Sequence, residues 1–247
     1  MIEEFRQAIG FLTRFPVGSG FRHEPELSGP AVSWYGVAGL IIGLTVSCVG
    51  GIMMIWPGVP AAVGASLALA AWVAVTGALH LDGLADCGDS VMGGFDRQRM
   101  LDIMKDSRVG TGAVVTVVTV LLIKWACLTW LFSHSGLLAP LFAAALARLS
   151  LSLTIMQMPY VRHEGLGTDL QGNIRHRDLL LYGGATLLIL LVASPSSLIV
   201  AMLGAVVGCA LVWLFVARKI GGYTGDVYGA QVEVAEATAL VALTVLA

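Results

Sequence analysis

The sequence has few charged residues for its size. Only 12% of its 247 residues are charged and 57% are hydrophobic, whereas about a quarter of a typical soluble domain is charged. This composition excludes an ordinary soluble globular protein and indicates an integral membrane protein. The chain also has no basic tail and no alternation of aromatic with basic residues, so we expect no nucleic acid among its partners.

We also expect no paired cysteines and no cleavable leader. The chain has no CxxC spacing, which argues against a structural zinc site or a disulfide framework, and we expect its cysteines to act as small apolar residues: Cys48, Cys87, Cys127 and Cys209. The first residues, MIEEFRQAIGFLTRFPVG, contain two early glutamates and no uninterrupted apolar core. They predict an amphipathic segment at the membrane surface and not a signal peptide.

Long apolar runs predict the spans. Three breaks between them lack Lys and Arg, whereas every other connecting segment carries basic residues, so all basic segments fall on one side if the N-terminus is cytoplasmic. We therefore predict an all-α, polytopic bundle of about seven transmembrane helices with a cytoplasmic N-terminus and an acidic metal site at the cytoplasmic edge. The predicted spans are approximately 31–56, 60–80, 111–132, 136–156, 179–194, 197–217 and 229–247.

No internal repeat is visible, so the whole of 1–247 is predicted to be a single integral membrane domain. Residues 1–30 form its cytoplasmic N-terminal segment, and 81–110, 157–178 and 218–229 are predicted to be cytoplasmic catalytic loops. Scattered glycines in the spans suit close helix packing in lipid and permit a homo-oligomer.

Three aspartates follow the second predicted span directly. We expect that helix to continue past His80 and to carry Asp82, Asp86 and Asp89, whose spacing of four and seven places them within about 60° of one another. Three anions on one stripe repel each other unless a cation joins them. Mg²⁺ is the simplest such ion, and handling phosphate is the simplest reason to hold it. The stripe indicates a membrane enzyme of phosphoryl-group chemistry.

Other charged residues add to this interpretation. Lys105 and Arg108 flank Asp106 and could hold phosphate oxygens. A glycine-rich stretch that includes Gly222 and Thr224 could turn backbone amides toward an anion. Charges deep in the predicted spans should face the bundle interior and pair with one another or serve the site; these are Lys124, Arg148, Glu233 and Glu236.

Together these segments resemble the cobalamin synthase family, also named adenosylcobinamide-GDP ribazoletransferase. The matching motifs run from one end of the chain to the other: TRFP at 13–16, HLDGLAD at 80–86 with Asp89, MKDSRVGT at 104–111, EGLG at 164–167 and GGYTGD at 221–226. Lys124, Arg148, Glu233 and Glu236 also match. Two positions depart from the family pattern, Ser90 in place of glycine and Tyr228 in place of leucine.

The resemblance implies the last assembly step of the vitamin B12 coenzyme, in which α-ribazole or its 5′-phosphate attacks the corrinoid phosphate of adenosylcobinamide-GDP and GMP leaves. It implies Mg²⁺ as cofactor, contact with membrane lipid, a multi-pass location in the bacterial cytoplasmic (inner) membrane, and an active site facing the cytoplasm. Asp82, Asp86 and Asp89 would hold the metal, and Asp106 or Asp226 would accept the proton. The substrate-binding residues would be Arg14, Lys105, Arg108, Lys124, Arg148, Glu164, Gly222, Thr224, Glu233 and Glu236.

The residues leave two alternative functions open. A CDP-alcohol phosphotransferase also carries aspartates at the cytoplasmic edge, but its D-x-x-D-G-x-x-A-R signature is not matched because no Arg follows Ala85. An ion transporter could use the charges within the spans, although transporters often show repeated halves.

Overall fold

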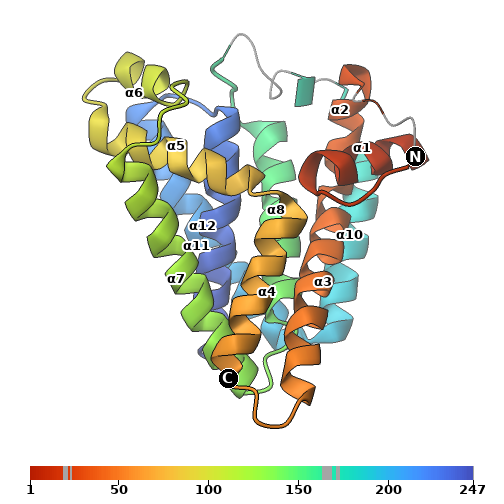
Figure 1. The fold of residues 1–247 in the computed structure, drawn as a ribbon. Helices are drawn as coiled ribbons and strands as arrows, with labels where there is room; N and C mark the ends of the chain where they lie inside the picture. Colours follow the sequence, from red (N-terminus) through yellow and green to blue (C-terminus); the bar gives the residue numbers. More distant parts are fainter. Residues whose placement is uncertain (19–21, 23, 163–168, 171–172, 247) are drawn as a thin grey trace.

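The computed structural model describes residues 1–18, 22, 24–162, 169–170 and 173–246. This part of the chain is helical and contains no strand beyond an isolated parallel bridge between Tyr160 and Tyr223, which confirms the predicted all-α class (Figure 1). The helices in chain order are α1 (Ile2–Leu12), α2 (Pro25–Ala31), the short 3-10 helix η1 (Val32–Trp34), α3 (Tyr35–Ile55), α4 (Ala61–Thr76), α5 (Leu79–Gly93), α6 (Arg97–Ile103), α7 (Thr111–Ser133), α8 (Ala139–Gln157), α10 (His176–Ala193), α11 (Pro195–Lys219) and α12 (Gly225–Leu243).

Several of these helices can cross a membrane. Five stretches are long and apolar enough: the run from α2 through α3 (Pro25–Ile55), α7, α8, α10 and α11; the bent pair of α4 and α5 gives a sixth if it is one span. The last predicted span corresponds to α12, which lies inside the bundle and carries Glu233 and Glu236. Because burial among other helices replaces contact with lipid, α12 does not need the high hydropathy of the outer helices.

The second predicted span breaks before His80, because α4 ends at Thr76 and α5 begins at Leu79. Gly77 and Ala78 both adopt left-handed backbone angles, with φ of 60° and 58°, and α4 and α5 meet at 91°. Glycine is the usual residue for such a helix end, but a left-handed alanine is uncommon, which is why the sequence did not predict the turn. The Arg14 side chain covers this corner, since a Cβ added to Gly77 would lie 2.1 Å from its Nε. As a result α5 lies across one end of the bundle (Figure 1).

Helix α12 forms the centre of the bundle and packs against α5, α7, α8 and α11. Small residues allow the closest of these contacts: Cβ atoms added to Gly204 and Gly208 of α11 would lie within 2.5 Å of Thr238 on α12. The outer faces of α10 and α11 expose large apolar side chains such as Leu180, Val192 and Leu203. An apolar exterior around a tightly packed interior is what a lipid solvent requires.

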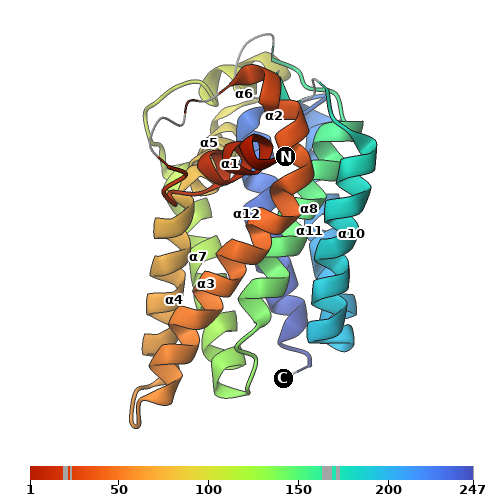
Figure 2. The same ribbon diagram turned by 90° about the vertical axis from the view of Figure 1, so that its right-hand side faces the viewer.

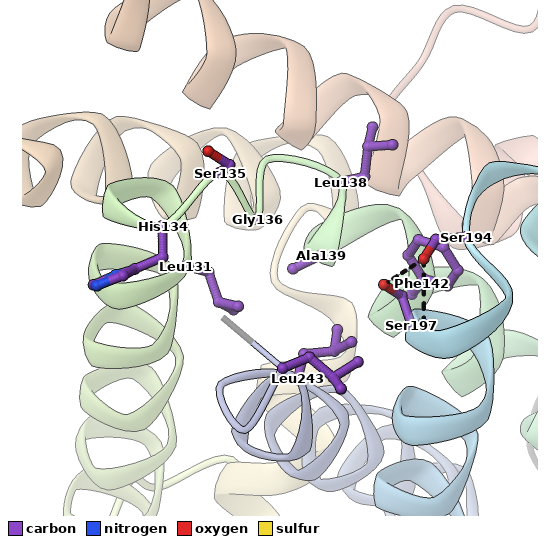
Figure 3. A pocket seen from close by; sticks show the side chains of 11 residues that line it. Leu131, His134, Ser135, Gly136, Leu138, Ala139, Phe142, Ser194, Ser197 and Leu243 are labelled. Carbon is purple, nitrogen blue, oxygen red and sulfur yellow. Dashed lines mark hydrogen bonds between the residues drawn. The ribbon is translucent and has the colours of Figure 1, made fainter.

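The two ends of the bundle differ. The N-terminus, α1, α5 and α6 lie at one end, and the C-terminus and the tight turns lie at the other (Figures 1 and 2). Figure 3 shows the second end, where the Ser194 hydroxyl caps α11 by accepting from the Ser197 amide at 3.3 Å. A cavity of about 260 Å³ there is lined by apolar and neutral polar residues together with His134, and by no carboxylate. The acidic chemistry predicted from the sequence therefore belongs to the N-terminal end.

Candidate active site

Helix α5 brings two of the predicted aspartates to the start of α12. The helices touch through glycine: a Cβ added to Gly83 would lie 2.6 Å from the Asp226 carbonyl oxygen, and one added to Gly229 would lie 3.0 Å from the His80 carbonyl oxygen. This contact gathers the carboxylates of Asp82, Asp86 and Asp226, which come from two helices distant in sequence, at one end of the bundle.

The gathered carboxylates repel one another. Burial raises the pKa of Asp86 to about 7, with further upward contributions from Asp226 and Asp82. Burial also raises the pKa of Asp226, and the neighbouring Arg162 opposes that rise. A raised carboxyl pKa means that the ionised form is disfavoured until a cation joins it. Among the described residues no three His, Cys, Asp or Glu side chains converge on one metal-sized point, so any metal held by these groups would need other ligands as well.

Asp89 makes different contacts. Its two carboxylate oxygens accept hydrogen bonds from the amides of Gly110, at 2.7 Å, and Ala113, at 2.8 Å. These amides belong to the first turn of α7, where backbone donors have no partner within the helix. Gly112 and Gly88 allow this approach, since a Cβ on Gly112 would lie 2.5 Å from the Gly88 carbonyl oxygen. Asp89 thus caps α7 from α5; its predicted role as a metal ligand stays a prediction.

Arg162 is a site residue that the sequence did not single out. Its guanidinium pairs with the Asp226 carboxylate at 2.6 Å, and both side chains are more than four-fifths buried. The backbone places it there: the Val161 amide donates to the Tyr223 carbonyl at 2.9 Å, and the Tyr223 amide to the Pro159 carbonyl at 2.8 Å. Gly222 permits this pairing, because a Cβ there would lie 2.8 Å from the Pro159 oxygen. No local motif around Arg162 signals a pairing across 64 residues.

A cavity of about 230 Å³ opens beside the acids. Its lining includes the polar residues Asp82, Asp226 and Arg162 as well as several apolar residues. A pocket with a few convergent polar groups and titratable residues of perturbed pKa is the usual form of an active site. The full lining is Phe11, Leu79, His80, Asp82, Gly83, Leu151, Ile155, Tyr160, Arg162, Leu170, Gly225, Asp226, Tyr228 and Gly229.

The segment that carries Lys105, Asp106 and Arg108, which were predicted to act on the phosphates, lies next to the start of α12. Arg97 donates to the Ile220 carbonyl at 2.6 Å, and the Thr224 hydroxyl lies 3.9 Å from the Met104 sulfur. Lys105 is exposed. Arg108 hydrogen-bonds Asp106 and thereby lowers the pKa of that carboxyl to about 2. A carboxylate this weakly basic is a poor proton acceptor, so of the two predicted candidates Asp226 is the better placed.

The charges within the spans pair as expected. Lys124 of α7 contacts both Glu233 and Glu236 of α12, and Arg148 of α8 contacts Glu236. All four side chains are buried, and one lysine and one arginine balance two glutamates. Lys124 also lies 5.0 Å from the centroid of the Trp72 ring. Because these charges are paired, they favour a role in holding α7, α8 and α12 together over an ion path.

One member of this buried cluster, Arg148, contacts a residue that lines the cavity. The Arg148 guanidinium lies 3.4 Å from His80 Nδ1, and His80 lines the cavity two residues before Asp82. This contact connects the buried charges to the site. None of the four lines the cavity, and their predicted role in substrate binding stays a prediction.

The remaining predicted residues make local contacts, and their predicted roles in substrate binding stay predictions. Thr224 caps α12, its hydroxyl accepting from the Val227 amide at 3.2 Å. Arg14 covers the corner between α4 and α5, and Gly222 lies against Pro159. Glu164 lies outside the described residues, so its predicted role stays a prediction.

Comparison with known proteins identifies the family. A family model described as cobalamin-5-phosphate synthase matches residues 4–244. Proteins from Pseudomonas paraeruginosa and Pseudomonas aeruginosa, both named adenosylcobinamide-GDP ribazoletransferase, are 41% identical over 96% of this chain and 95% of their own length. A protein of the same name from Pseudomonas fluorescens is 36% identical over 96% of each chain. No solved structure matches the chain significantly. The chain belongs to the cobalamin-5-phosphate synthase family.

Proposed function

We propose that this chain is a membrane-embedded transferase that joins adenosylcobinamide-GDP to α-ribazole, or to its 5′-phosphate, and releases GMP. Relatives that carry this activity as their name align over nearly the whole chain. The structural observation that carries the proposal is that Asp82, Asp226 and Arg162 line one cavity, with Asp86 near enough for Asp226 and Asp82 to raise its pKa. Carboxylates with a cation beside them are the groups that phosphoryl transfer requires.

The chemistry of the donor set fits Mg²⁺. This ion prefers oxygen ligands and usually binds through one or two carboxylates together with substrate phosphates and water. Asp82 and Asp86 would supply the protein ligands, so the absence of a third converging side chain among the described residues does not oppose the assignment. When bound, the ion would neutralise charge on the diphosphate of the corrinoid substrate.

The protein groups then have separate tasks. A ribose hydroxyl oxygen of the nucleoside bonds to the phosphorus attached to the corrinoid, and the bond from that phosphorus to the oxygen of the leaving GMP breaks. Asp226 accepts the hydroxyl proton, because it lines the cavity and burial raises its pKa. Lys105 and Arg108, on the loop next to α12, attract the phosphates of the incoming substrate. Asp89 positions α5 against α7.

We further propose that the end bearing α5 and α6 faces the cytoplasm of a bacterium and that the protein crosses its inner membrane several times with the N-terminus inside. The arginines and lysines of the connecting segments support this orientation, since all lie at the end that bears α5 and α6 and basic connecting segments favour the cytoplasmic side. Contact with membrane lipid follows from the apolar outer faces of α10 and α11.

The direct test is turnover by the purified protein in lipid. Adenosylcobinamide-GDP and α-ribazole are supplied together and GMP is followed with Mg²⁺ and with EDTA. We expect GMP only when both substrates and Mg²⁺ are present. A parallel reaction with CDP-diacylglycerol and a headgroup alcohol should give no CMP. Release of CMP, or turnover that persists fully in EDTA, would contradict the proposal.

A further inference from the structure

The cavity beside the acids has a chemically mixed lining. It includes the polar residues Asp82, Asp226 and Arg162, and it also includes the apolar residues Phe11, Leu151 and Ile155. Leu151 and Ile155 are almost fully buried within the bundle. A ligand that fills the cavity must therefore have one polar part and one apolar part.

Two of the residues that line the cavity carry a buried donor with no hydrogen-bond partner among the residues that the structure describes. The donors are Nε of Arg162 and the hydroxyl of Tyr228, and both atoms are buried. The Tyr228 side chain is only 4% exposed, and its ring is held in a stack between Tyr160, at 6.1 Å, and Tyr223, at 5.3 Å. Buried donors are nearly always paired, so an unpaired couple that lines a cavity indicates a ligand that supplies acceptors.

The two substrates of the proposed reaction differ in the chemical group that each could place in this cavity. Adenosylcobinamide-GDP offers guanine, which carries amide and amino groups, or a corrinoid ring, which is far larger than a cavity of about 230 Å³. α-Ribazole offers an apolar benzimidazole joined to a ribose. Guanine against Phe11, Leu151 and Ile155 would leave several polar groups unpaired, which is costly, whereas a ribosylated benzimidazole has only one acceptor nitrogen in its ring system.

We propose that this cavity is the nucleoside subsite. The benzimidazole packs against Phe11, Leu151 and Ile155, and ribose oxygens accept hydrogen bonds from Arg162 Nε and the Tyr228 hydroxyl. This inference rests on the proposed function and deepens it. It places a ribose hydroxyl beside Asp226, which lines the same cavity, and leaves the guanosine and the corrinoid outside it.

The test compares two variants, each of which removes one of the two unpaired hydrogen-bond donors. Tyr228→Phe removes only the hydroxyl, and Arg162→Lys keeps the positive charge beside Asp226 while removing Nε. Tyr223→Phe is the matched control, because Tyr223 belongs to the same ring stack but does not line the cavity. For each protein KM is measured for both substrates, and Kd for α-ribazole is measured by calorimetric titration without the corrinoid.

We expect each donor variant to raise both KM and Kd for α-ribazole about tenfold, the change that one lost hydrogen bond produces. KM for adenosylcobinamide-GDP should stay within about twofold of its value in the unaltered protein, as should all constants of Tyr223→Phe. A selective rise in KM for adenosylcobinamide-GDP, or an unchanged Kd for α-ribazole, would overturn the inference. If Tyr228→Phe does not fold, Arg162→Lys decides the question.

Failure of the inference can be told apart from failure of the proposed function. Turnover by the unaltered protein tests the function, and it does not depend on which cavity holds the nucleoside. The calorimetric titration tests the subsite, and it needs neither turnover nor Mg²⁺. Turnover together with unchanged α-ribazole affinity in both donor variants would retain the function and remove the subsite.

Discussion

Gly83 of α5 lies against the backbone of Asp226 of α12, so closely that a Cβ at Gly83 would come within 2.6 Å of the Asp226 carbonyl oxygen. This one contact sets the distance between the aspartates of α5 and the acid of α12. Larger residues at position 83 would separate the two halves of the site. Glycine at position 83 lets α5 and α12 approach closely enough for their aspartate side chains to converge.

Gly83→Ala should reduce turnover strongly. The added methyl group must push α5 away from α12, and a shift of about 1 Å in catalytic groups can cost on the order of 100-fold in rate. Gly184→Ala is the matched control, since Gly184 is also helical but a Cβ there would meet nothing within 4 Å; we expect normal turnover and equal or slightly higher stability. Equal activity in both variants would show that the close contact is not needed.

Asp82→Asn should abolish turnover without changing insertion into the membrane. Removing one group that stabilises charge in a transition state typically costs at least about 100-fold. Asp102→Asn serves as the control, because Asp102 is an exposed acid on α6 that hydrogen-bonds Gln98. Activities are compared at saturating Mg²⁺ after equal amounts of folded protein have been confirmed by gel filtration. Near-normal turnover of Asp82→Asn would remove the metal assignment.

Asp89→Asn tests whether this residue is a cap or a metal ligand. Asparagine can accept only one of the two hydrogen bonds from the first turn of α7, so the variant should lose about 1 kcal/mol, or about 2–4 °C in Tm. The Mg²⁺ concentration that gives half-maximal turnover should stay unchanged. A large rise in that concentration with little change in Tm would restore the metal role predicted from the sequence.

Much of this arrangement follows from the order of residues along the chain. The basic connecting segments predicted which ends of the helices lie together, and the spacing of Asp82 and Asp86 predicted that they share a face. The pairing of Lys124 and Arg148 with Glu233 and Glu236 was also predicted, and the structure confirms it. Each of these inferences uses helix periodicity or the cost of an unpaired charge in lipid, and both can be evaluated without coordinates.

The remaining features depend on contacts between distant segments. Arg162 reaches Asp226 only because residues 159–161 pair with 222–223, and periodicity does not report such pairing. The turn between α4 and α5 needs a left-handed Ala78, a conformation that alanine does not signal. Asp89 looked equivalent to Asp82 and Asp86 on a helical projection, and only the position of α7 distinguishes it.

Lys124→Met should destabilise the protein strongly. The change leaves Glu233 and Glu236 with only Arg148 to balance them, and an uncompensated buried charge typically costs about 3–5 kcal/mol. The double variant Lys124→Met with Glu233→Gln restores neutrality and should recover a large part of the lost Tm. If the double variant is less stable than Lys124→Met alone, charge balance is not what these residues provide.

Asp86 should make the metal-free protein less stable as pH rises. Its pKa is about 7 in the folded protein, against an ordinary value of 3.8. Between these values the folded state binds the proton more tightly than the unfolded state does, so stability falls with rising pH until the carboxyl is fully ionised above pH 7. In EDTA we therefore expect Tm to fall between about pH 4 and pH 7, and Asp86→Asn to remove part of that fall. Mg²⁺ added at pH 8 should raise Tm of the unaltered protein more than that of Asp86→Asn, because the ion replaces the proton as the positive partner. A parallel fall in both proteins, with equal responses to Mg²⁺, would show that Asp86 neither carries the repulsion nor binds the ion.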